Sequence, residues 1–236
     1  MKFDVTIIVP IFNEEDCLPL FFDKMDKFLA ISEKSVKILL VDDGSQDKSS
    51  QLIVHKCHQD HRYHWIKLAE NSGLSAALKI GIRNSDTPYT GYIDADLQTT
   101  PEDFQSFYPL LDQYDLVCGI RQKRQDSIVK KMSSKIANKI RRIVLNDGVQ
   151  DSGCPLKIGK TKVLQQVPKF NGFHRFLPAL VLMSGGSIIQ IPVRHFPRVA
   201  GVAKYHLLNR LVGPFIDMLG VAWLSRRAIR TTTVTQ

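Results

Sequence analysis

Short apolar runs alternate with segments of helix-type spacing along the first half of the chain. The apolar runs have the length of buried strands, and polar residues or proline bound them. The predicted strands cover residues 6–9 (ended by Pro10), 37–41, 65–68, 92–93, 115–121 and 187–193. The predicted helices cover residues 18–31, 75–82 and 126–142. A further helix would run from a cap at Asp47 or Ser49 to Cys57, and another would begin at Pro101.

This alternation predicts an α/β fold with a mostly parallel central sheet and helices on both of its faces. The chain has 236 residues, of which 44% are hydrophobic, so it can bury a sizeable core. We expect one domain over residues 1–205. An amphipathic, basic tail over residues 206–236 would follow it.

Polar residues follow three of the predicted strands at the point where each strand ends. Because ligands bind at the carboxyl ends of the strands in parallel sheets, these residues indicate a binding edge. They are Asn13 and Glu14, Asp42 and Asp43, and Asp94 and Asp96. No Gly-x-Gly-x-x-Gly or Walker phosphate loop is present, so metal and basic side chains would have to handle any phosphate.

Asp94 and Asp96 are separated only by Ala95. Along an extended chain, side chains at i and i+2 point the same way, so both carboxylates would face one point beyond a strand end. Two hard oxygen ligands there suit Mg²⁺ or Mn²⁺, and Gln98 would add a third oxygen. The alternative is a polar turn without a ligand, since Asp is common in turns.

The net charge of +9 suits nucleic acid, an anionic membrane surface or anionic substrates. The basic residues are scattered and form no helix-turn-helix, finger or aromatic-basic pattern, which disfavours nucleic acid. The four cysteines lie far apart without a Cys-x-x-Cys pair, and no signal peptide precedes them, so we expect a reduced, cytoplasmic setting. Histidines at 55, 58, 61 and 64 have metal-like spacing, but we interpret them as a solvated face.

Four segments in this order and spacing resemble the family-2 glycosyltransferases of the GT-A fold. They are Val-Pro-Ile-Phe-Asn-Glu (9–14), Val-Asp-Asp-Gly-Ser (41–45), Asp-Ala-Asp-Leu-Gln (94–98) and Arg-Val-Ala-Gly (198–201). Within that family, the chain is similar to the dolichol-phosphate mannose synthases and the bacterial polyprenyl-phosphate sugar transferases. The resemblance covers residues 4–210.

The resemblance implies a role for each matching residue. Asp94 and Asp96 would face the diphosphate and a divalent metal, Mg²⁺ or Mn²⁺, with Gln98 as a further metal ligand. The segment that begins at Asp151 resembles the part of the family that lies beneath the sugar. The resemblance places six residues around the nucleotide: Pro10, Phe12, Glu14, Val41, Asp43 and Ala95. It places three basic residues on phosphates: Arg121, Arg198 and, from a flexible loop, Lys204.

Two positions depart from the family pattern. Phe12 stands where relatives often carry Tyr, which removes one hydroxyl from the nucleotide pocket. Ala203 stands where Ser is usual in the loop that carries Lys204. Neither change removes a charged group.

The implied reaction is inverting transfer of a hexose from a nucleotide diphosphate sugar (GDP- or UDP-hexose) to a polyprenyl phosphate, either undecaprenyl or dolichyl. A phosphate acceptor is already anionic near pH 7 and needs no strong base. Asp151 is the one candidate base, and a turn residue is the alternative interpretation. Two other functions stay open: transfer to a saccharide hydroxyl of a glycolipid or polysaccharide, and a non-catalytic nucleotide-sugar binding module.

Residues 207–224 are the most apolar part of the second half, yet Arg210, Pro214 and Asp217 interrupt them. A membrane-spanning helix needs about 20 apolar residues, so this stretch is too short. A helix lying in the interface of an anionic membrane fits better, because Arg226, Arg227 and Arg230 follow. Packing on the domain and a contact between two copies are the alternatives. We therefore expect peripheral association with the cytoplasmic face of the membrane, with a membrane partner or a homo-oligomer as further options.

Overall fold

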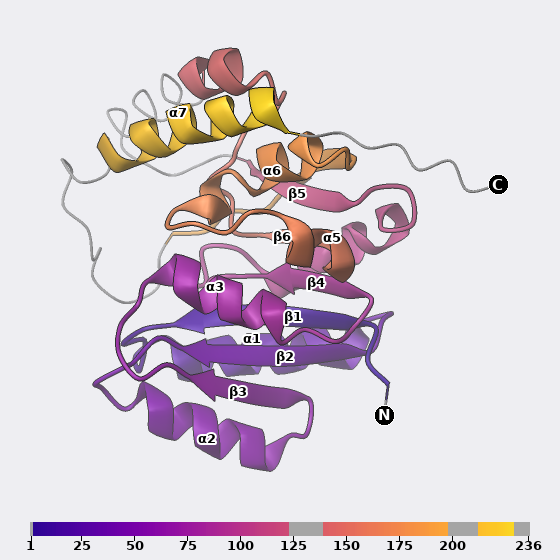
Figure 1. Cartoon of the computed structure of the whole chain (residues 1–236). Coiled ribbons are helices and arrows are strands. Elements are labelled where there is room, and N and C mark those ends of the chain that lie inside the picture. The colour runs from indigo at the N-terminus through magenta and orange to yellow at the C-terminus, as the bar shows by residue number, and fades with distance from the viewer. Residues whose placement is uncertain (1, 123–138, 198–211, 229–236) are drawn as a thin grey trace.

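The computed structural model describes residues 2–122, 139–197 and 212–228. Within these residues, seven strands form one sheet in the order β3-β2-β1-β4-β6-β5-β7 (Figure 1). The strands are β1 (Val5–Ile11), β2 (Val36–Asp42), β3 (Tyr63–Lys67), β4 (Tyr89–Tyr92), β5 (Leu116–Arg121), β6 (Lys157–Lys160) and β7 (Ile188–Val193). All neighbouring pairs are parallel except those that β6 makes with β4 and β5. The predicted mostly parallel sheet is therefore confirmed.

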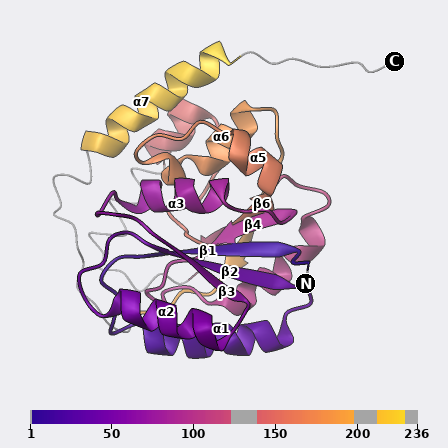
Figure 2. The same cartoon turned by 60° about the horizontal axis from the view of Figure 1, so that its bottom comes forward.

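Helices cover both faces of the sheet, as predicted (Figure 2). The α-helices are α1 (Leu18–Ile31), α2 (Ser49–Gln59), α3 (Leu74–Arg83), α5 (Thr161–Gln166), α6 (Leu177–Met183) and α7 (Val212–Arg227). Three short 3₁₀-helices are η1 (Pro101–Ser106), η2 (Tyr108–Leu110) and η3 (Phe173–Arg175). The predicted helix over 126–142 lies mostly outside the described residues, and residues 139–145 are helical.

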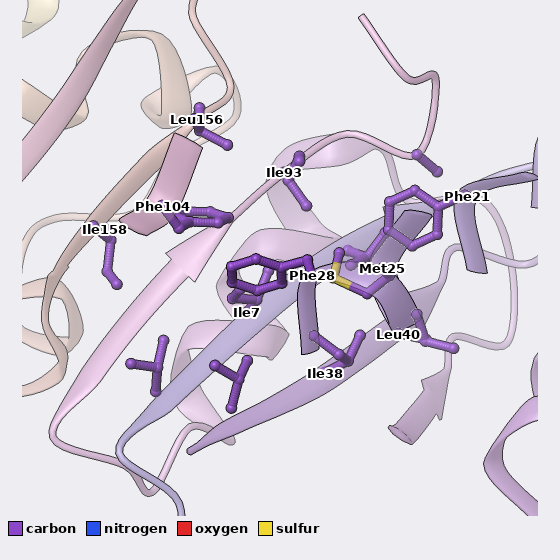
Figure 3. Packing of buried hydrophobic residues seen from close by; sticks show 14 of the residues in the cluster. Ile7, Phe21, Met25, Phe28, Ile38, Leu40, Ile93, Phe104, Leu156 and Ile158 are labelled. Atoms are coloured by element: carbon purple, nitrogen blue, oxygen red, sulfur yellow. The ribbon is translucent and has the colours of Figure 1, made fainter. Parts of the chain in front are cut away.

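Alternation along the central strands divides the core into two clusters. Ile7 and Ile38 point to the face that α1 covers, where they meet Met25 and Phe28 (Figure 3). Ile8, next to Ile7 in the sequence, points to the opposite face and packs in a second cluster with α3 and α6. Because side chains alternate along a strand, strands buried on both faces are apolar at nearly every position.

The first strand differs from its prediction, because β1 continues through Pro10 to Ile11. Proline lacks a backbone N–H and normally weakens a central strand. Here β4 pairs with β1 only from Val5 to Ile8, so position 10 has a strand neighbour only in β2, at Val41. The missing donor therefore removes no bond between β1 and β4.

The segment after Pro101 and the short strand β6 also depart from expectation. Pro101 begins a 3₁₀-helix. Its Phe104 is buried against Phe107, and both rings belong to the core cluster on the α1 side of the sheet. Strand β6 was not predicted, because Lys157–Lys160 contains a single apolar residue, Ile158. Its position between β4 and β5 buries it regardless of its composition.

Helix α7 packs against the body of the protein near α6 (Figure 1). Its inward side buries Met218, Val221 and Ala222. Among the helices that the structure describes, none is long and apolar enough to cross a membrane.

Helix α3 lies unusually close to strand β1 at Gly81. A Cβ atom built on Gly81 would lie 2.6 Å from Cγ2 of Ile8 in β1, nearer than side chains tolerate. Gly220 in α7 is the opposite case, because a Cβ atom there would meet nothing within 4 Å. The close approach of helix and sheet thus depends on the missing side chain at position 81.

We predict that Gly81→Ala lowers the free energy of unfolding by about 1–3 kcal/mol, because it overpacks the contact between α3 and β1. The matched control, Gly220→Ala, should be neutral or raise stability by up to ~1 kcal/mol, because alanine favours helix. Urea unfolding followed by circular dichroism measures both. Equal effects of the two substitutions would contradict the packing described.

Candidate functional site

The loops after β1 and β2 are joined by hydrogen bonds at the carboxyl edge of the sheet. The N–H of Asn13 donates to Oγ of Ser45 (3.0 Å), and the Asn13 Oδ1 accepts the N–H of Gln46 (2.8 Å). The N–H of Glu14 donates to Oγ of Ser49 (2.9 Å). Asn13 adopts a left-handed conformation (φ 51°), which Asn tolerates better than most residues. The two loops therefore form one platform beside the strand ends.

Asp42 and Asp43 hold this platform in place from within. Oδ1 of Asp42 accepts the N–H of Ser45 (2.8 Å). The carboxylate of Asp43 accepts the N–H groups of Ser72 and Gly73, each at 2.8 Å, and so fixes the residues that begin α3. No local sequence pattern predicts this anchoring, because the residues in contact lie about 30 positions apart. The part of Asp43 in nucleotide binding stays a prediction.

Gly44 turns the chain directly after the two aspartates. Its φ of +72° belongs to the left-handed region, and a Cβ atom there would lie 2.6 Å from the backbone carbon of Glu70. Only glycine satisfies both constraints without strain. The Val-Asp-Asp-Gly-Ser segment is thus fitted closely against the loop that follows β3.

The other predicted nucleotide residues divide into two groups by exposure. Pro10, near the end of β1, and Phe12 and Glu14, in the loop after it, are partly exposed. Val41 and Ala95 are at most 2% exposed and pack in the two core clusters. At these two positions, a nucleotide lying on the surface would meet backbone rather than side chain.

The paired aspartates lie just beyond β4, but the chain there is not extended. Strand β4 ends at Tyr92, and the N–H of Ile93 still donates to the carbonyl of Ile8 (3.1 Å). The chain then turns, with Leu97 left-handed (φ 59°) and the N–H of Gln98 donating to Oδ1 of Asp96 (3.1 Å). The expectation of an extended Asp-x-Asp is therefore wrong at this point, because residues 95 and 96 form a turn just after β4. Convergence of the two carboxylates stays a prediction.

The donor set of this turn fits a hard divalent cation. Asp94 and Gln98 are partly exposed, and Asp96 is 9% exposed. Among the described residues, no group of three His, Cys, Asp or Glu side chains is placed to hold a metal by itself. Two carboxylates and one amide leave the other positions to phosphate oxygens and water, as Mg²⁺ usually requires.

Arg121 and Asp151 form an ion pair with each other at the end of β5. Nε and one terminal nitrogen of Arg121 each donate to a different oxygen of Asp151, both at 2.8 Å. The N–H of Arg121 also donates to Asp151 (3.2 Å). The sequence placed both residues in the site but did not predict that they pair. This bidentate geometry fixes the guanidinium at the same sheet edge as Asp94.

The segment after β7 lies beside the turn at residues 94–98 (the aspartate turn). The N–H of Phe196 donates to the carbonyl of Gln98 (2.9 Å), and Arg194 pairs with Asp103 (2.7 Å). Arg198 and Lys204 lie outside the described residues, so their predicted phosphate contacts stay predictions.

A buried lysine that was not predicted from the sequence lies beneath this edge. Lys157 of β6 is 1% exposed, and its ammonium donates to the hydroxyl of Tyr92 (3.4 Å). Burial raises the pKa of Tyr92 to about 12; the Lys157 charge opposes this rise and the Asp94 charge adds to it. A single lysine in a short polar strand carries no sequence signal.

The histidine series is a solvated surface, as interpreted from the sequence. His55 and His58 lie on α2, His61 lies in the turn after it, and His64 lies on β3. All four are exposed. The four cysteines are free thiols.

The chain shares its fold with solved structures of mycobacterial proteins. The structure of glucosyl-3-phosphoglycerate synthase from Mycobacterium tuberculosis, in complex with Mn²⁺, UDP and glucosyl-3-phosphoglycerate, superposes with a TM-score of 0.64 at 15% identity. The match covers 98% of this chain and 82% of that chain. A further mycobacterial protein gives a TM-score of 0.68 at 17% identity, covering 98% and 77% of the two chains. These likenesses confirm the GT-A fold.

Relatives found by sequence have a higher identity to this chain than these solved structures. An undecaprenyl-phosphate 4-deoxy-4-formamido-L-arabinose transferase from Salmonella choleraesuis (strain SC-B67) is 31% identical over 218 residues, 91% of this chain. Its counterpart from Klebsiella pneumoniae subsp. pneumoniae is 29% identical over 217 residues, again 91% of this chain. The chain spans 66% of the length of each relative. The model of glycosyl transferase family 2 matches residues 6–167, and the chain therefore belongs to this family.

Proposed function

We propose that this protein is an inverting glycosyltransferase that moves a sugar from a GDP- or UDP-sugar to a polyprenyl phosphate at the cytoplasmic face of the membrane. The observation that carries the proposal is the aspartate turn at the carboxyl edge of a sheet whose sequence matches family 2. The relatives named above transfer to undecaprenyl phosphate, which supports a lipid phosphate acceptor. Their sugar is a substituted arabinose, so the donor class extends from hexoses to pentoses.

The proposed chemistry develops negative charge on the leaving diphosphate. Asp94, Asp96 and Gln98 would hold Mg²⁺ or Mn²⁺, which supplies Lewis-acid stabilisation of that charge. Arg121 adds fixed N–H donors at the same edge, since Asp151 orients its guanidinium. Nucleotide contacts come from Phe12, Glu14 and Asp43 in the platform loops and from Pro10 at the end of β1. Val41 and Ala95 would contribute through their backbone, since their side chains are buried.

The acceptor phosphate removes the need for a general base. Both carboxylate oxygens of Asp151 already accept hydrogen bonds from Arg121. We therefore assign Asp151 the task of holding Arg121 rather than that of taking a proton. The polyprenyl phosphate attacks as an anion.

Helix α7 is the element proposed to contact the membrane. Four large apolar side chains on its outer side are 49–61% exposed: Phe215, Ile216, Leu219 and Trp223. Arg227 lies over the ring of Trp223 (5.4 Å), and Arg226 is its neighbour. Aromatic and aliphatic side chains beside arginines match the interface of an anionic bilayer. Residues 206–236 would thus form the membrane-facing tail, with α7 packed on the domain by its inner side.

The direct experiment combines the protein with Mg²⁺ or Mn²⁺, a short-chain polyprenyl phosphate and a panel of labelled UDP- and GDP-sugars. Lipid extraction should carry label from one donor into the organic phase. Label transferred to a saccharide hydroxyl but never to lipid phosphate would favour the alternative acceptor. Binding of nucleotide sugar without any transfer would favour the non-catalytic module.

We predict that Asp96→Asn lowers turnover by at least about 100-fold, because it removes charge from the metal-bearing turn. The asparagine oxygen still accepts the N–H of Gln98, so the turn and the unfolding midpoint should persist. EDTA should abolish turnover of the wild type. The matched control is Asp23→Asn, an exposed carboxylate of α1 paired with Lys27, which should leave turnover unchanged. Equal turnover of Asp96→Asn and wild type would contradict the metal assignment.

We predict that the double variant Phe215→Ser/Trp223→Ser binds anionic vesicles at least about tenfold more weakly than wild type, because it removes two insertable side chains. Sedimentation with phosphatidylglycerol vesicles measures the affinity. Turnover with a water-soluble short-chain acceptor should be retained. Trp65→Ser is the control, since Trp65 is 42% exposed on β3, away from α7. A loss of vesicle affinity in the control alone would contradict the assignment of α7.

A further inference from the structure

Lys157 is a buried cation with no acidic partner in the part of the chain that the structure describes. Lysine is almost never fully buried unless it is paired. Among the described residues, no ion pair joins Lys157 to a carboxylate. Its ammonium instead donates to the carbonyl of Ser152 (3.2 Å), the carbonyl of Cys154 and the hydroxyl of Tyr92 (3.4 Å). These three acceptors match the three hydrogens of an ammonium group, so its capacity is used completely.

Two of the three acceptors belong to one turn, residues 151–154. The N–H of Cys154 donates to the carbonyl of Asp151 (3.2 Å) and closes this turn. On the core side, Lys157 donates hydrogen bonds to the carbonyls of Ser152 and Cys154 in this turn. At the first residue of the turn, Arg121 donates hydrogen bonds to the carboxylate of Asp151. Two cations therefore fix a turn of four residues.

The inward carbonyls determine which way the amide groups of the turn point. The described residues contain no cis peptide bond, and in a trans peptide the C=O and N–H groups point in opposite directions. Because the carbonyl of Ser152 points into the core, the N–H of Gly153 points away from it. The carbonyl of Cys154 also points inward, but the next residue is Pro155, which has no N–H. Gly153 thus offers the outward donor next to these inward carbonyls.

Gly153 is the exposed tip of the turn, and its N–H has no hydrogen-bond partner among the described residues. A Cβ atom built there would lie 3.2 Å from a terminal nitrogen of Arg121. Lys157, which begins β6, is paired with Tyr92 of β4 and Cys118 of β5. The turn before it therefore lies at the sheet edge that carries the aspartate turn and Arg121.

We propose that Lys157 is a positioning residue that aims the Gly153 N–H at the sugar of the bound donor, to which this amide donates a hydrogen bond. This inference rests on the proposed function, because it supplies that site with a contact to the sugar rather than to the nucleotide. Charge-assisted bonds to both carbonyls hold the turn more strongly than neutral donors would. A backbone donor held in this way needs no rearrangement when the sugar arrives.

The protein has 14 glycines, so labelling with [¹⁵N]glycine allows NMR to follow their amide signals. Calorimetry with Mg²⁺ first selects the UDP- or GDP-sugar that binds, so the test does not depend on turnover. The Gly153 signal should shift with this nucleotide sugar and stay in place with the corresponding nucleoside diphosphate alone. The Gly44 signal, on the nucleotide platform, should shift with both.

Two pairs of variants separate positioning from stability. In Lys157→Met, the Gly44 response should persist, the Gly153 response should vanish, and affinity for the nucleotide sugar should fall by about tenfold, as for one lost hydrogen bond. Lys157→Arg, which retains donors to the two carbonyls, should restore part of the Gly153 response. Gly153→Pro and Gly153→Ala both add a Cβ atom, but only the proline removes the N–H. Gly153→Pro should therefore bind the sugar donor about tenfold more weakly than Gly153→Ala, with equal affinity for the diphosphate.

Each contrary result has a distinct meaning. A nucleotide sugar that binds without moving the Gly153 signal overturns this inference and leaves the proposed function standing. A Gly153 shift with the diphosphate alone overturns the sugar contact. An unchanged Gly153 response in Lys157→Met overturns the role of Lys157. Failure of every nucleotide sugar to bind overturns the proposed function and this inference together.

Discussion

The parallel pairing of β1 with β2 and β4 is the constraint on which the rest of the structure depends. Ile11 lies opposite Asp42 and Ile8 lies opposite Tyr92, so the loops that follow these three strands leave the sheet at one edge. A shift of register by one residue would turn every core side chain to the wrong face. The same burial that fixes the core therefore fixes where the polar loops emerge. The platform and the aspartate turn are adjacent because the strands beneath them are in register.

Charge at this edge is arranged in layers. The acidic groups Asp43, Asp94 and Asp96 lie in the loops, while Arg121 and Lys157 lie beside and beneath them. Much of this charge serves backbone groups: Asp43 fixes the start of α3, and Lys157 fixes the turn at 152–154. A site for an anionic ligand needs donors that stay in place when the ligand is absent. Hydrogen bonds from buried charges to backbone supply that rigidity without flexible side chains.

The sequence predicted the features that repeat along the chain. Helix α1 occupies residues 18–31, as expected, because its apolar face has a clear helical period. The positions of the polar loops followed from the predicted ends of the strands. Long-range pairings were beyond reach: Arg121 with Asp151, Asp43 with the start of α3, and the lysine beneath the edge leave no local pattern. Strand β6 could not be predicted for the same reason, because its pairing with β4 and β5 rather than its own residues makes it a strand. The extended Asp94-x-Asp96 was a wrong prediction, because the chain turns at residues 95–96 and the Asp96 carboxylate then accepts the N–H of Gln98.

We expect a metal and a nucleoside diphosphate to bind together at the carboxyl edge of the sheet. Paramagnetic Mn²⁺ tests it directly, since it broadens the NMR signals of nearby amides in [¹⁵N]glycine-labelled protein. With Mn²⁺ and UDP or GDP, the account predicts loss of the Gly44 and Gly153 signals. Those of Gly185 and Gly186, which precede β7 at the opposite edge, should stay sharp. Broadening at Gly185 and Gly186 with Gly44 and Gly153 unaffected would contradict the account.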